Sequence, residues 1–434
     1  MTSLEIRPLT AGDDLDAQRD LGERAFGPMP PAYRERWRQM YLPAIEEGRY
    51  LGVFDGGDQV GGAGWHDMTQ WWGGEPLPMA GIASVKVAPE ARGQGLGRQL
   101  MTEVLRAVAA RGYPVSALYP ATMPIYRSLG WELAGAAYHA VVPGRALRSL
   151  TPPDPALARG PGGPSDLALP GGPAGSFPPA GTSGGSAALP ELRRATEADA
   201  GEVLAVFGRA FRAARASGEV ARDLGSVQYW LANSPEVYCY LCDDGFIAYR
   251  WDPAAKGLVA DFLAAATPQA QRALLSLLAG HSSTARTVEF RASPASPLWW
   301  QLRERDAQLT RSDMWMLRLT DVRAAIERRG YPGAVAGSAS LTVIDKDIEA
   351  NAGTWTFTLD GGQATLERAT PGPAGPRAAG GPALTVGPRG LAALYAGTPV
   401  PTLRQAGLVA GGTPEADDLL TAAFAGTASM MDDF

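Results

Sequence analysis

The sequence is poor in the side chains that bind metals and form disulfides. Its 434 residues include only two cysteines and three histidines. Cys239 and Cys242 form a Cys-x-x-Cys pair, but residues 237–242 have the pattern of a strand, in which positions three apart face opposite sides. We therefore expect neither a metal site nor a redox-active cysteine pair.

Long apolar runs and a surplus of positive charge are also missing. No stretch of about 18 apolar residues occurs, and the first residues do not combine a basic start with an apolar run. From this we expect a cytoplasmic protein without a membrane-spanning segment. The formal net charge is −6 and the isoelectric point is near 5.3. We expect no nucleic-acid partner, and the charge mildly favours cationic ligands.

Glycine and proline are abundant instead, with 53 and 36 residues. Residues 151–189 consist mostly of Pro, Gly, Ser and Ala, which bury too little apolar surface to offset the entropy lost on ordering. This segment is typical of a linker. With about 100–200 residues to a domain, the chain is predicted to hold domains at 1–150, 190–318 and 319–434, the first two joined by the linker at 151–189.

A strand leads into a helix through a glycine-rich turn within residues 82–101. The strand is β-branched around Val85 and Val87, and the turn contains Gly93, Gly95 and Gly97. Such a turn suits a phosphate, because glycine permits close approach and the helix N-terminus offers unpaired N–H groups. A Walker loop is excluded because no Gly-Lys-Ser/Thr follows, and a dinucleotide fingerprint is excluded because its third glycine is missing.

The beginning of the chain recurs after the linker. Glu-Leu-Arg-Arg-Ala-Thr at 191–196 corresponds to Glu-Ile-Arg-Pro-Leu-Thr at 5–10, and Arg-Ala-Phe occurs at both 24–26 and 209–211. This predicts a second copy of one α/β fold. Where the glycine turn would recur, residues 259–275 keep a strand, a proline and a helix but contain no glycine. We expect this degenerate copy to serve as packing surface and to bind no phosphate.

The last part of the chain has a different pattern. Residues 341–345, 353–359 and 362–368 alternate apolar and polar side chains with turns between them, which predicts an antiparallel sheet. Amphipathic helices are expected at 388–395 and 414–425. The fold class is therefore α/β in the two copies, followed by an α+β module.

The motif Val-x-Val-x-Pro-x-x-Arg-Gly-x-Gly-x-Gly at 85–97 resembles the acetyl-CoA motif of the GNAT acetyltransferases. Residues 126–131, Tyr-Arg-Ser-Leu-Gly-Trp, resemble the segment in which a short helix of that fold turns into its next strand. With two copies and an α+β module in this order, the chain resembles the enhanced-intracellular-survival (Eis) acetyltransferases. The resemblance implies tandem GNAT folds, a sterol-carrier-protein-like C-terminal domain, and a hexamer built as a dimer of trimers.

The resemblance also implies a cosubstrate, acetyl-CoA, and the residues that bind it. In the superfamily the strand lies beside the pantetheine, the loop amides bind the pyrophosphate, and the amide at Val87 donates to the developing oxyanion. The implied acetyl-CoA-binding residues are Val85, Lys86, Val87, Arg92, Gly93, Gln94, Gly95, Leu96, Gly97, Arg98, Ala121 and Thr122.

Two groups are implied to move protons. Tyr126 would face the cofactor sulfur, and its hydroxyl, with a pKa of about 10, stays protonated at neutral pH and can protonate the departing thiolate. An alternative is that Tyr126 only hydrogen-bonds CoA. The family uses its C-terminal carboxylate as the catalytic base, and in this chain that carboxylate belongs to Phe434. The residues alone predict instead a solvated acidic tail at the end of the chain.

The expected substrate is a primary amine of a cationic molecule, such as an aminoglycoside, a polyamine or a lysine. Phe26, Trp37, Ser84 and Asp433 are the expected substrate-binding residues, although core packing accounts equally for aromatic side chains at helical spacing. Transfer of a longer acyl group stays open. A second hypothesis is a lipid- or partner-binding scaffold that carries a vestigial GNAT domain.

Overall fold

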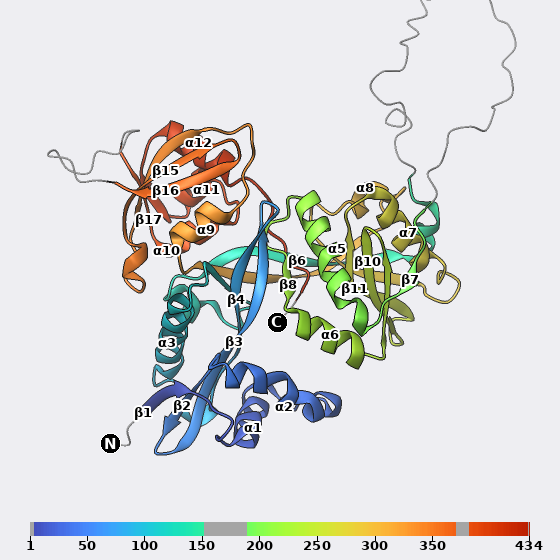
Figure 1. Ribbon diagram of the computed structural model, residues 1–434, viewed down its shortest axis with the longest axis horizontal. Helices are drawn as coiled ribbons and strands as arrows, with labels where there is room; N and C mark the ends of the chain where they lie inside the picture. Colours follow the sequence, from blue (N-terminus) through green and yellow to red (C-terminus); the bar gives the residue numbers. More distant parts are fainter. Residues whose placement is uncertain (1–3, 152–188, 370–381, 433) are drawn as a thin grey trace, which may run out of the picture.

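The computed structural model describes residues 4–151, 189–369, 382–432 and 434. The chain forms three lobes (Figure 1), which we call the first repeat (residues 4–149), the second repeat (residues 193–319) and the third region (residues 322–432). The expected linker falls almost wholly outside the described residues. Whether domains begin and end at the predicted positions stays a prediction.

The first repeat contains the strand, glycine turn and helix expected near residue 90. Its helix α1 begins where the Asp14 side chain accepts hydrogen bonds from the amides of Asp16 and Ala17, and it ends at Gly27, whose φ is 99°. Its elements are β1 (Leu4–Pro8), α1 (Leu15–Phe26), α2 (Pro31–Glu46), β2 (Tyr50–Asp55), β3 (Asp58–Trp72), β4 (Glu75–Val87), α3 (Leu96–Ala110), β5 (Val115–Leu118), α4 (Met123–Arg127) and β6 (Glu132–Pro143).

The second repeat has the same order of helices and strands around its central strands, which confirms a second, degenerate copy. Thr267 caps α7 by accepting from the amide of Ala270. The elements are β7 (Arg193–Arg194), α5 (Ala200–Ala213), β8 (Val220–Arg222), α6 (Leu224–Asn233), β9 (Val237–Cys242), β10 (Gly245–Asp252), β11 (Gly257–Ala265), α7 (Pro268–Ala279), β12 (Thr287–Ala292), α8 (Leu298–Gln301) and β13 (Gln308–Leu319).

One continuous sheet runs through both repeats, because the repeats exchange strands. Its order is β1-β2-β3-β4-β5-β13-β6-β12-β11-β10-β9-β7, with β8 paired to β3 off this path. Strand β13 of the second repeat lies between β5 and β6, and β6 of the first repeat lies between β13 and β12. Each repeat therefore completes its half of the sheet with a strand of the other.

The third region is the α+β module that the alternation predicts. Its five-stranded sheet has the order β16-β15-β14-β17-β18. The elements are α9 (Val322–Arg328), β14 (Gly337–Val343), β15 (Gly353–Asp360), β16 (Gln363–Arg368), β17 (Leu384–Val386), α10 (Pro388–Tyr395), α11 (Val400–Gln405), β18 (Val409–Gly411) and α12 (Pro414–Ala423).

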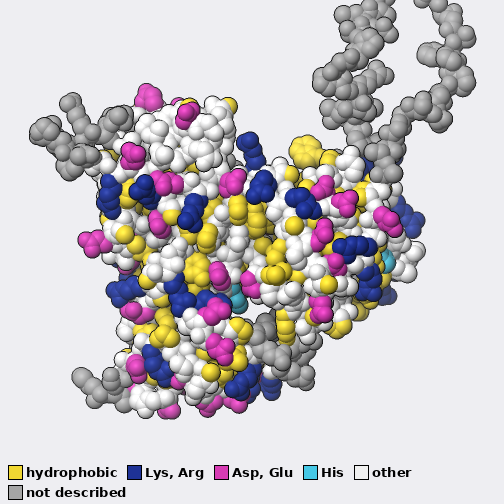
Figure 2. Space-filling model, in the orientation of Figure 1, with side chains coloured by type: hydrophobic (Ala, Val, Ile, Leu, Met, Phe, Trp, Pro, Cys, Tyr) yellow, Lys and Arg dark blue, Asp and Glu magenta, His cyan; other side chains and the backbone are white. Residues whose placement is uncertain are grey.

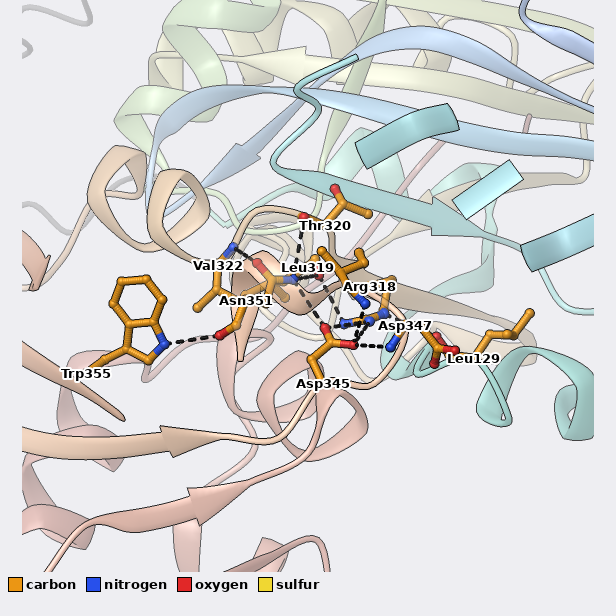
Figure 3. A network of polar contacts seen from close by, with 10 residues as sticks. Leu129, Arg318, Leu319, Thr320, Val322, Asp345, Asp347, Asn351 and Trp355 are labelled. Carbon is orange, nitrogen blue, oxygen red and sulfur yellow. Dashed lines mark hydrogen bonds and ion pairs between the residues drawn. The ribbon is translucent and has the colours of Figure 1, made fainter. Parts of the chain in front are cut away.

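Aromatic packing and buried ion pairing both attach the third region to the repeats. The long β3–β4 hairpin rises between the third region and the second repeat (Figure 1), and the ring of Trp72 at its tip packs 4.7 Å from that of Tyr395. In the interior, Arg318 of β13 forms a buried ion pair with Asp345. Its Nη2 lies 2.8 and 2.7 Å from the two carboxylate oxygens, Oδ1 and Oδ2. Figure 3 shows that Asn351 also binds this carboxylate. The lobes thus share buried polar and apolar contacts.

Candidate active site

Two parallel strands of the first repeat pair over only part of their length, and we call the region between their unpaired parts the candidate cleft. Strands β4 and β5 pair over residues 79–81 and 115–117 and then diverge. On its other side β4 has a bulge, because its register with β3 shifts between Gly62 and Gly64. Ser84 lies in this bulge with a φ of 55°, a conformation that side chains other than glycine rarely adopt. The main chain of β4 from residue 82 onward is therefore open to a ligand on the β5 side.

The glycine turn at the end of β4 has the geometry of an anion-binding loop. Gly93 and Gly95 have φ values of 79° and 78°, and no atom lies within 4 Å of a Cβ added to either. Residues 92–95 are exposed, and no residue of the described chain accepts a hydrogen bond from the amides of residues 93–97. These amides and the N-terminus of α3 suit a diphosphate. The loop thus fits the phosphates of acetyl-CoA.

The other residues of the implied cofactor set surround this loop. Arg92 and Gln94 are exposed, and Arg98 donates to the main-chain carbonyl of Ser128 at 3.4 Å. Ala121 and Thr122 are exposed in the turn that leads into α4. Lys86 differs.

The ammonium of Lys86 is directed away from the cleft. Its Nζ donates to the main-chain carbonyl of Gln18 at 3.1 Å, and the residue is 5 % exposed. Burial lowers the pKa of Lys86 to about 7. If this residue contacts a cofactor, it does so through its main chain, while the side chain ties α1 to β4.

Tyr126 lies on α4, where it packs against the core below the cleft. It is 6 % exposed, and its ring centroid lies 6.5 Å from that of Trp131. Burial raises the pKa of Tyr126, so the hydroxyl stays protonated at neutral pH. No described residue hydrogen-bonds this hydroxyl. The Tyr126 hydroxyl therefore keeps its proton at neutral pH, and no hydrogen bond to a described residue competes for that proton.

The end of the chain enters this site from the second repeat. We call residues 428–434 the C-terminal strap. The hydroxyl of Ser429 and the amide of Met431 both donate to the Glu219 carboxyl, at 2.8 and 3.1 Å. Arg291 of β12 donates to the main-chain carbonyl of Met431 at 2.9 Å. Burial raises the pKa of Glu219 to about 7.

The last residues of the strap reach β4. The Asp432 carboxylate pairs with Arg222 of β8 at 2.9 Å, and its main-chain carbonyl accepts from the Tyr119 hydroxyl at 2.9 Å. The ring of Phe434 lies 5.8 Å from that of Tyr119. It also covers Gly81, where an added Cβ would come within 2.8 Å of the ring. Gly81 is the last residue at which β4 and β5 pair, so the ring of Phe434 lies where the two strands begin to diverge.

The expected substrate-binding residues are only partly brought together. The hydroxyls of Ser84 and Tyr41 are hydrogen-bonded to each other at 2.7 Å. Trp37 stacks on Tyr41 at 5.2 Å but is buried in a small core, and Phe26 is 63 % exposed at the end of α1. Tyr41 and Tyr50, whose hydroxyl donates to the main-chain carbonyl of Ser84 at 3.3 Å, are therefore the aromatic residues that contact the bulge. Asp433 lies outside the described residues.

Sequence reasoning missed the side chains that hold the strap. Glu219, Arg222 and Arg291 belong to the second repeat, which the missing glycines mark only as packing surface. Their spacing in the sequence carries no motif, and they converge only because β8 pairs with β3 and β12 with β6. No sequence signal identifies them.

Three general observations concern the molecule as a whole. On the face shown in Figure 2, acidic and basic side chains are interspersed over all three lobes. Within the described ranges, no group of three or more His, Cys, Asp or Glu side chains is placed to hold a metal ion. In the same part of the chain, no helix has the length and apolar character needed to cross a bilayer.

Three family profiles match the chain in the order of its lobes. Profiles described as acetyltransferase (GNAT) domains match residues 5–134 and 218–319. A profile described as a sterol carrier protein domain matches residues 322–432. These matches confirm tandem GNAT folds followed by a sterol-carrier-like domain.

Known proteins resemble the whole chain. The crystal structure of a GCN5-related N-acetyltransferase from Kribbella flavida is 35 % identical, with a TM-score of 0.84 over 100 % of this chain and 99 % of that one. Eis1 from Mycobacterium abscessus shares the fold, at a TM-score of 0.72, 23 % identity and full coverage of both chains. N-acetyltransferase Eis of Mycobacterium tuberculosis is 32 % identical over 290 residues, 64 % of this chain and 65 % of that protein.

The curated Eis relatives are thus matched over somewhat less than two thirds of their length. The Kribbella structure is matched throughout, with the same three lobes in the same order. The chain belongs to the GCN5-related N-acetyltransferase family, as an Eis-like member.

Proposed function

We propose that this protein transfers an acetyl group from acetyl-CoA to a primary amine of a cationic molecule. The observation that carries the proposal is the glycine loop between β4 and α3, in which the amides of residues 93–97 donate to no acceptor in the described chain. Acetyl-CoA supplies the acetyl group as an activated thioester. The loop amides of residues 93–97 bind its phosphates, and the bulge at Ser84 leaves β4 main-chain groups for the rest of the molecule.

Tyr126 is the proposed general acid. When the amine attacks the thioester carbonyl, a C–N bond forms, the C–S bond breaks and the thiolate takes a proton. The burial that raises the pKa of Tyr126 keeps that proton available at neutral pH. The amide of Val87, at the end of the open strand, is the proposed donor to the oxyanion.

The C-terminal carboxylate of Phe434 is the proposed acceptor of the amine proton. An α-carboxyl has a pKa of about 3.3–3.7 in water, so its role is to orient the ammonium and to accept its proton directly or through water. Three contacts support this role, because they fix an end of the chain that would otherwise fray. Ser429 donates to Glu219, Arg222 pairs with Asp432, and the ring of Phe434 packs on Gly81.

Negative charge at the cleft favours a cationic amine, but fewer groups supply it than the sequence indicates. The Asp432 carboxylate is paired with Arg222. Attraction of the amine therefore rests on the terminal carboxylate and Asp433. His66 does not add a base of ordinary strength, because burial and the neighbouring Arg222 and Arg49 lower its pKa to about 4.

The experiment mixes the full chain with acetyl-CoA, a thiol reagent and a panel of aminoglycosides, polyamines and lysine peptides. Thiol release that depends on the amine supports the proposal. No release with any amine, together with normal acetyl-CoA binding, would point to a scaffold. Longer acyl-CoA donors belong in the same panel. A hexamer built as a dimer of trimers and a cytoplasmic location also stay proposals, and light scattering measures the oligomeric state.

A further inference from the structure

The second repeat retains a cleft at the position that corresponds to the cofactor cleft of the first. Strands β11 and β12 pair in parallel over residues 258–260 and 288–290 and then diverge. The register of β10 with β11 shifts between Ala248 and Tyr249, as that of β3 with β4 shifts in the first repeat. The loop before α7 has no glycine, so its main chain cannot approach a phosphate as closely as that of the first repeat. The other end of the cleft remains open.

A cavity of about 410 Å³ occupies this open end. It lies between α5, β11, the start of α7, the C-terminal strap and the segment that follows α9. Apolar side chains from three of these elements line it, among them Phe211, Leu263 and Met431. A cavity of this size and lining accepts a small molecule with an apolar body.

Two residues of the cavity lining carry buried donors that have no partner in the described chain. The amide nitrogen Nε2 of Gln271 and the guanidinium nitrogen Nε of Arg329 have no hydrogen-bond partner and are shielded from solvent. Gln271 is 5 % exposed and Arg329 2 %. An unsatisfied buried donor costs about 1–3 kcal/mol. Both donors would gain from a ligand that brings an acceptor.

The charge of Arg329 makes an anionic acceptor favourable. Its other nitrogens donate to the main-chain carbonyls of Tyr395 and Phe424, and its guanidinium lies 4.8 and 4.9 Å from the centroids of their rings. No carboxylate in the described part of the chain forms an ion pair with it. A buried cation that is balanced only by carbonyls and rings attracts an anion strongly.

The mouth of the cavity carries the same sign of charge. A second hollow of about 390 Å³ adjoins it and shares Gly73, Arg215 and Gly330 as lining. Its lining holds two exposed arginines, Arg212 and Arg215, and one half-buried acid, Glu75. The one acid in the cavity wall, Glu219, is committed to the strap, and burial raises its pKa to about 7, which reduces its negative charge at neutral pH. The route into the cavity thus favours anions.

We propose that this cavity of the second repeat binds a small carboxylate with an apolar body, whose carboxylate accepts from Gln271 and Arg329. The site is separate from the cleft of the first repeat and does not depend on acetyl transfer. Because Ser429 and Met431 of the strap form part of its wall, a bound carboxylate contacts the segment that places Phe434 at the other cleft.

The test is calorimetric titration of octanoate into the full chain, with octanol and octylamine as matched probes of the same length. We expect one octanoate to bind per chain. Octanol should bind at least about tenfold more weakly, and octylamine should not bind. A parallel titration with saturating acetyl-CoA separates the two clefts, because octanoate in the first-repeat cleft would be displaced and octanoate in the second would not.

Two pairs of variants locate the site. Gln271→Leu removes one donor and should weaken octanoate about tenfold, whereas Gln269→Leu, on the exposed face of the same helix, should not. Ala425→Trp fills the cavity mouth and should abolish binding, whereas Ala422→Trp, exposed and outside the lining, should not. Thermal unfolding checks that each variant is folded. No heat with octanoate, equal binding of octylamine, or unchanged affinity in folded Ala425→Trp would overturn the proposal.

Discussion

At the scale of single residues, the proposed chemistry depends on two protons and on what holds their carriers. Tyr126 keeps its proton because its surroundings are apolar, and it has no partner in the described chain that would compete for it. Phe434 is held by the ring of Tyr119, and the residues just before it are held by Arg222 of β8 and Arg291 of β12. Both groups are therefore placed before a substrate arrives, which lowers the entropic part of the barrier.

Replacing Tyr126 with phenylalanine tests the acid. The ring and its packing remain, and only the hydroxyl is lost, so we expect kcat to fall about 10²–10⁴-fold with the Kd for acetyl-CoA unchanged. Steady-state kinetics and calorimetry measure the two quantities. Tyr113→Phe, in the same apolar cluster, is the matched control and should leave kcat unchanged. A Tyr126→Phe enzyme with normal kcat would show that the tyrosine only orients CoA.

Extending the chain by one glycine after Phe434 tests the base. The ring can still cover Gly81 and pack on Tyr119, but the carboxylate moves by one residue. We expect turnover to be lost while acetyl-CoA binding persists. Deletion of Phe434 should have the same effect on turnover and in addition loosen the strap. Full activity in the extended chain would contradict the assignment.

Glu219 gives a prediction for stability against pH. Its pKa is about 7 in the folded chain and ordinarily 4.5, so the folded state binds more protons between these values. Its contribution to the free energy of unfolding is complete below about pH 4.5 and is lost as pH rises through 7, by up to about 3 kcal/mol. In Glu219→Gln, this part of the pH dependence should disappear. Denaturant unfolding at pH 5 and pH 8 measures the free energy of unfolding of both proteins. An equal change in this free energy between the two pH values in the wild type and in Glu219→Gln would refute the prediction.

At the scale of elements, two strands make the two repeats a single unit. Strand β6 of the first repeat pairs with β12 and β13 of the second, and β13 of the second pairs with β5 and β6 of the first. His139 of β6 also contacts Glu289 of β12 at 2.8 Å and Asp313 of β13 at 2.9 Å. Removal of either strand would leave unpaired edges in both halves of the sheet. The degenerate repeat is therefore part of the scaffold of the first.

The ion pair between Arg318 and Asp345 fixes the third region to β13. Their side chains are 1 % and 0 % exposed, so Asp345→Ala leaves a buried cation without its partner. We expect a loss of about 3–5 kcal/mol in the free energy of unfolding. The double variant Arg318→Met with Asp345→Leu should recover much of that loss. Chemical denaturation measures both, and a double variant no more stable than Asp345→Ala would contradict this account.

At the scale of the whole molecule, the chain returns to its first lobe at its last residue. The strap passes the cavity of the second repeat, then β8, and ends over β4, so all three lobes contribute to one site. The core of the third region is filled by aromatic rings, among them Tyr331, Phe357 and Phe424, and the hairpin tip with Trp72 packs into it. These contacts favour a structural role for that region over a lipid-carrying one.

The sequence carries the local features and misses the long-range ones. The glycine turn, the helix after it and the alternating strands of the third region are written in short patterns, because turn chemistry and periodicity act over a few residues. The exchange of β6 and β13 joins residues about 170 positions apart, such as His139 and Asp313. The contact of Arg222 with Asp432 spans 210 positions. Only the folded sheet brings such side chains together.

Titration of acetyl-CoA into the full chain tests the central claim most directly. The account predicts one acetyl-CoA bound per chain, and Gly95→Val should weaken it about tenfold or more, because a branched side chain opposes the φ of 78° and covers the free amides. Gly57→Val, in the β2–β3 turn with a φ of 106° and equally open surroundings, is the control and should bind normally. No heat with the wild-type chain, or equal affinity in Gly95→Val, would contradict the account.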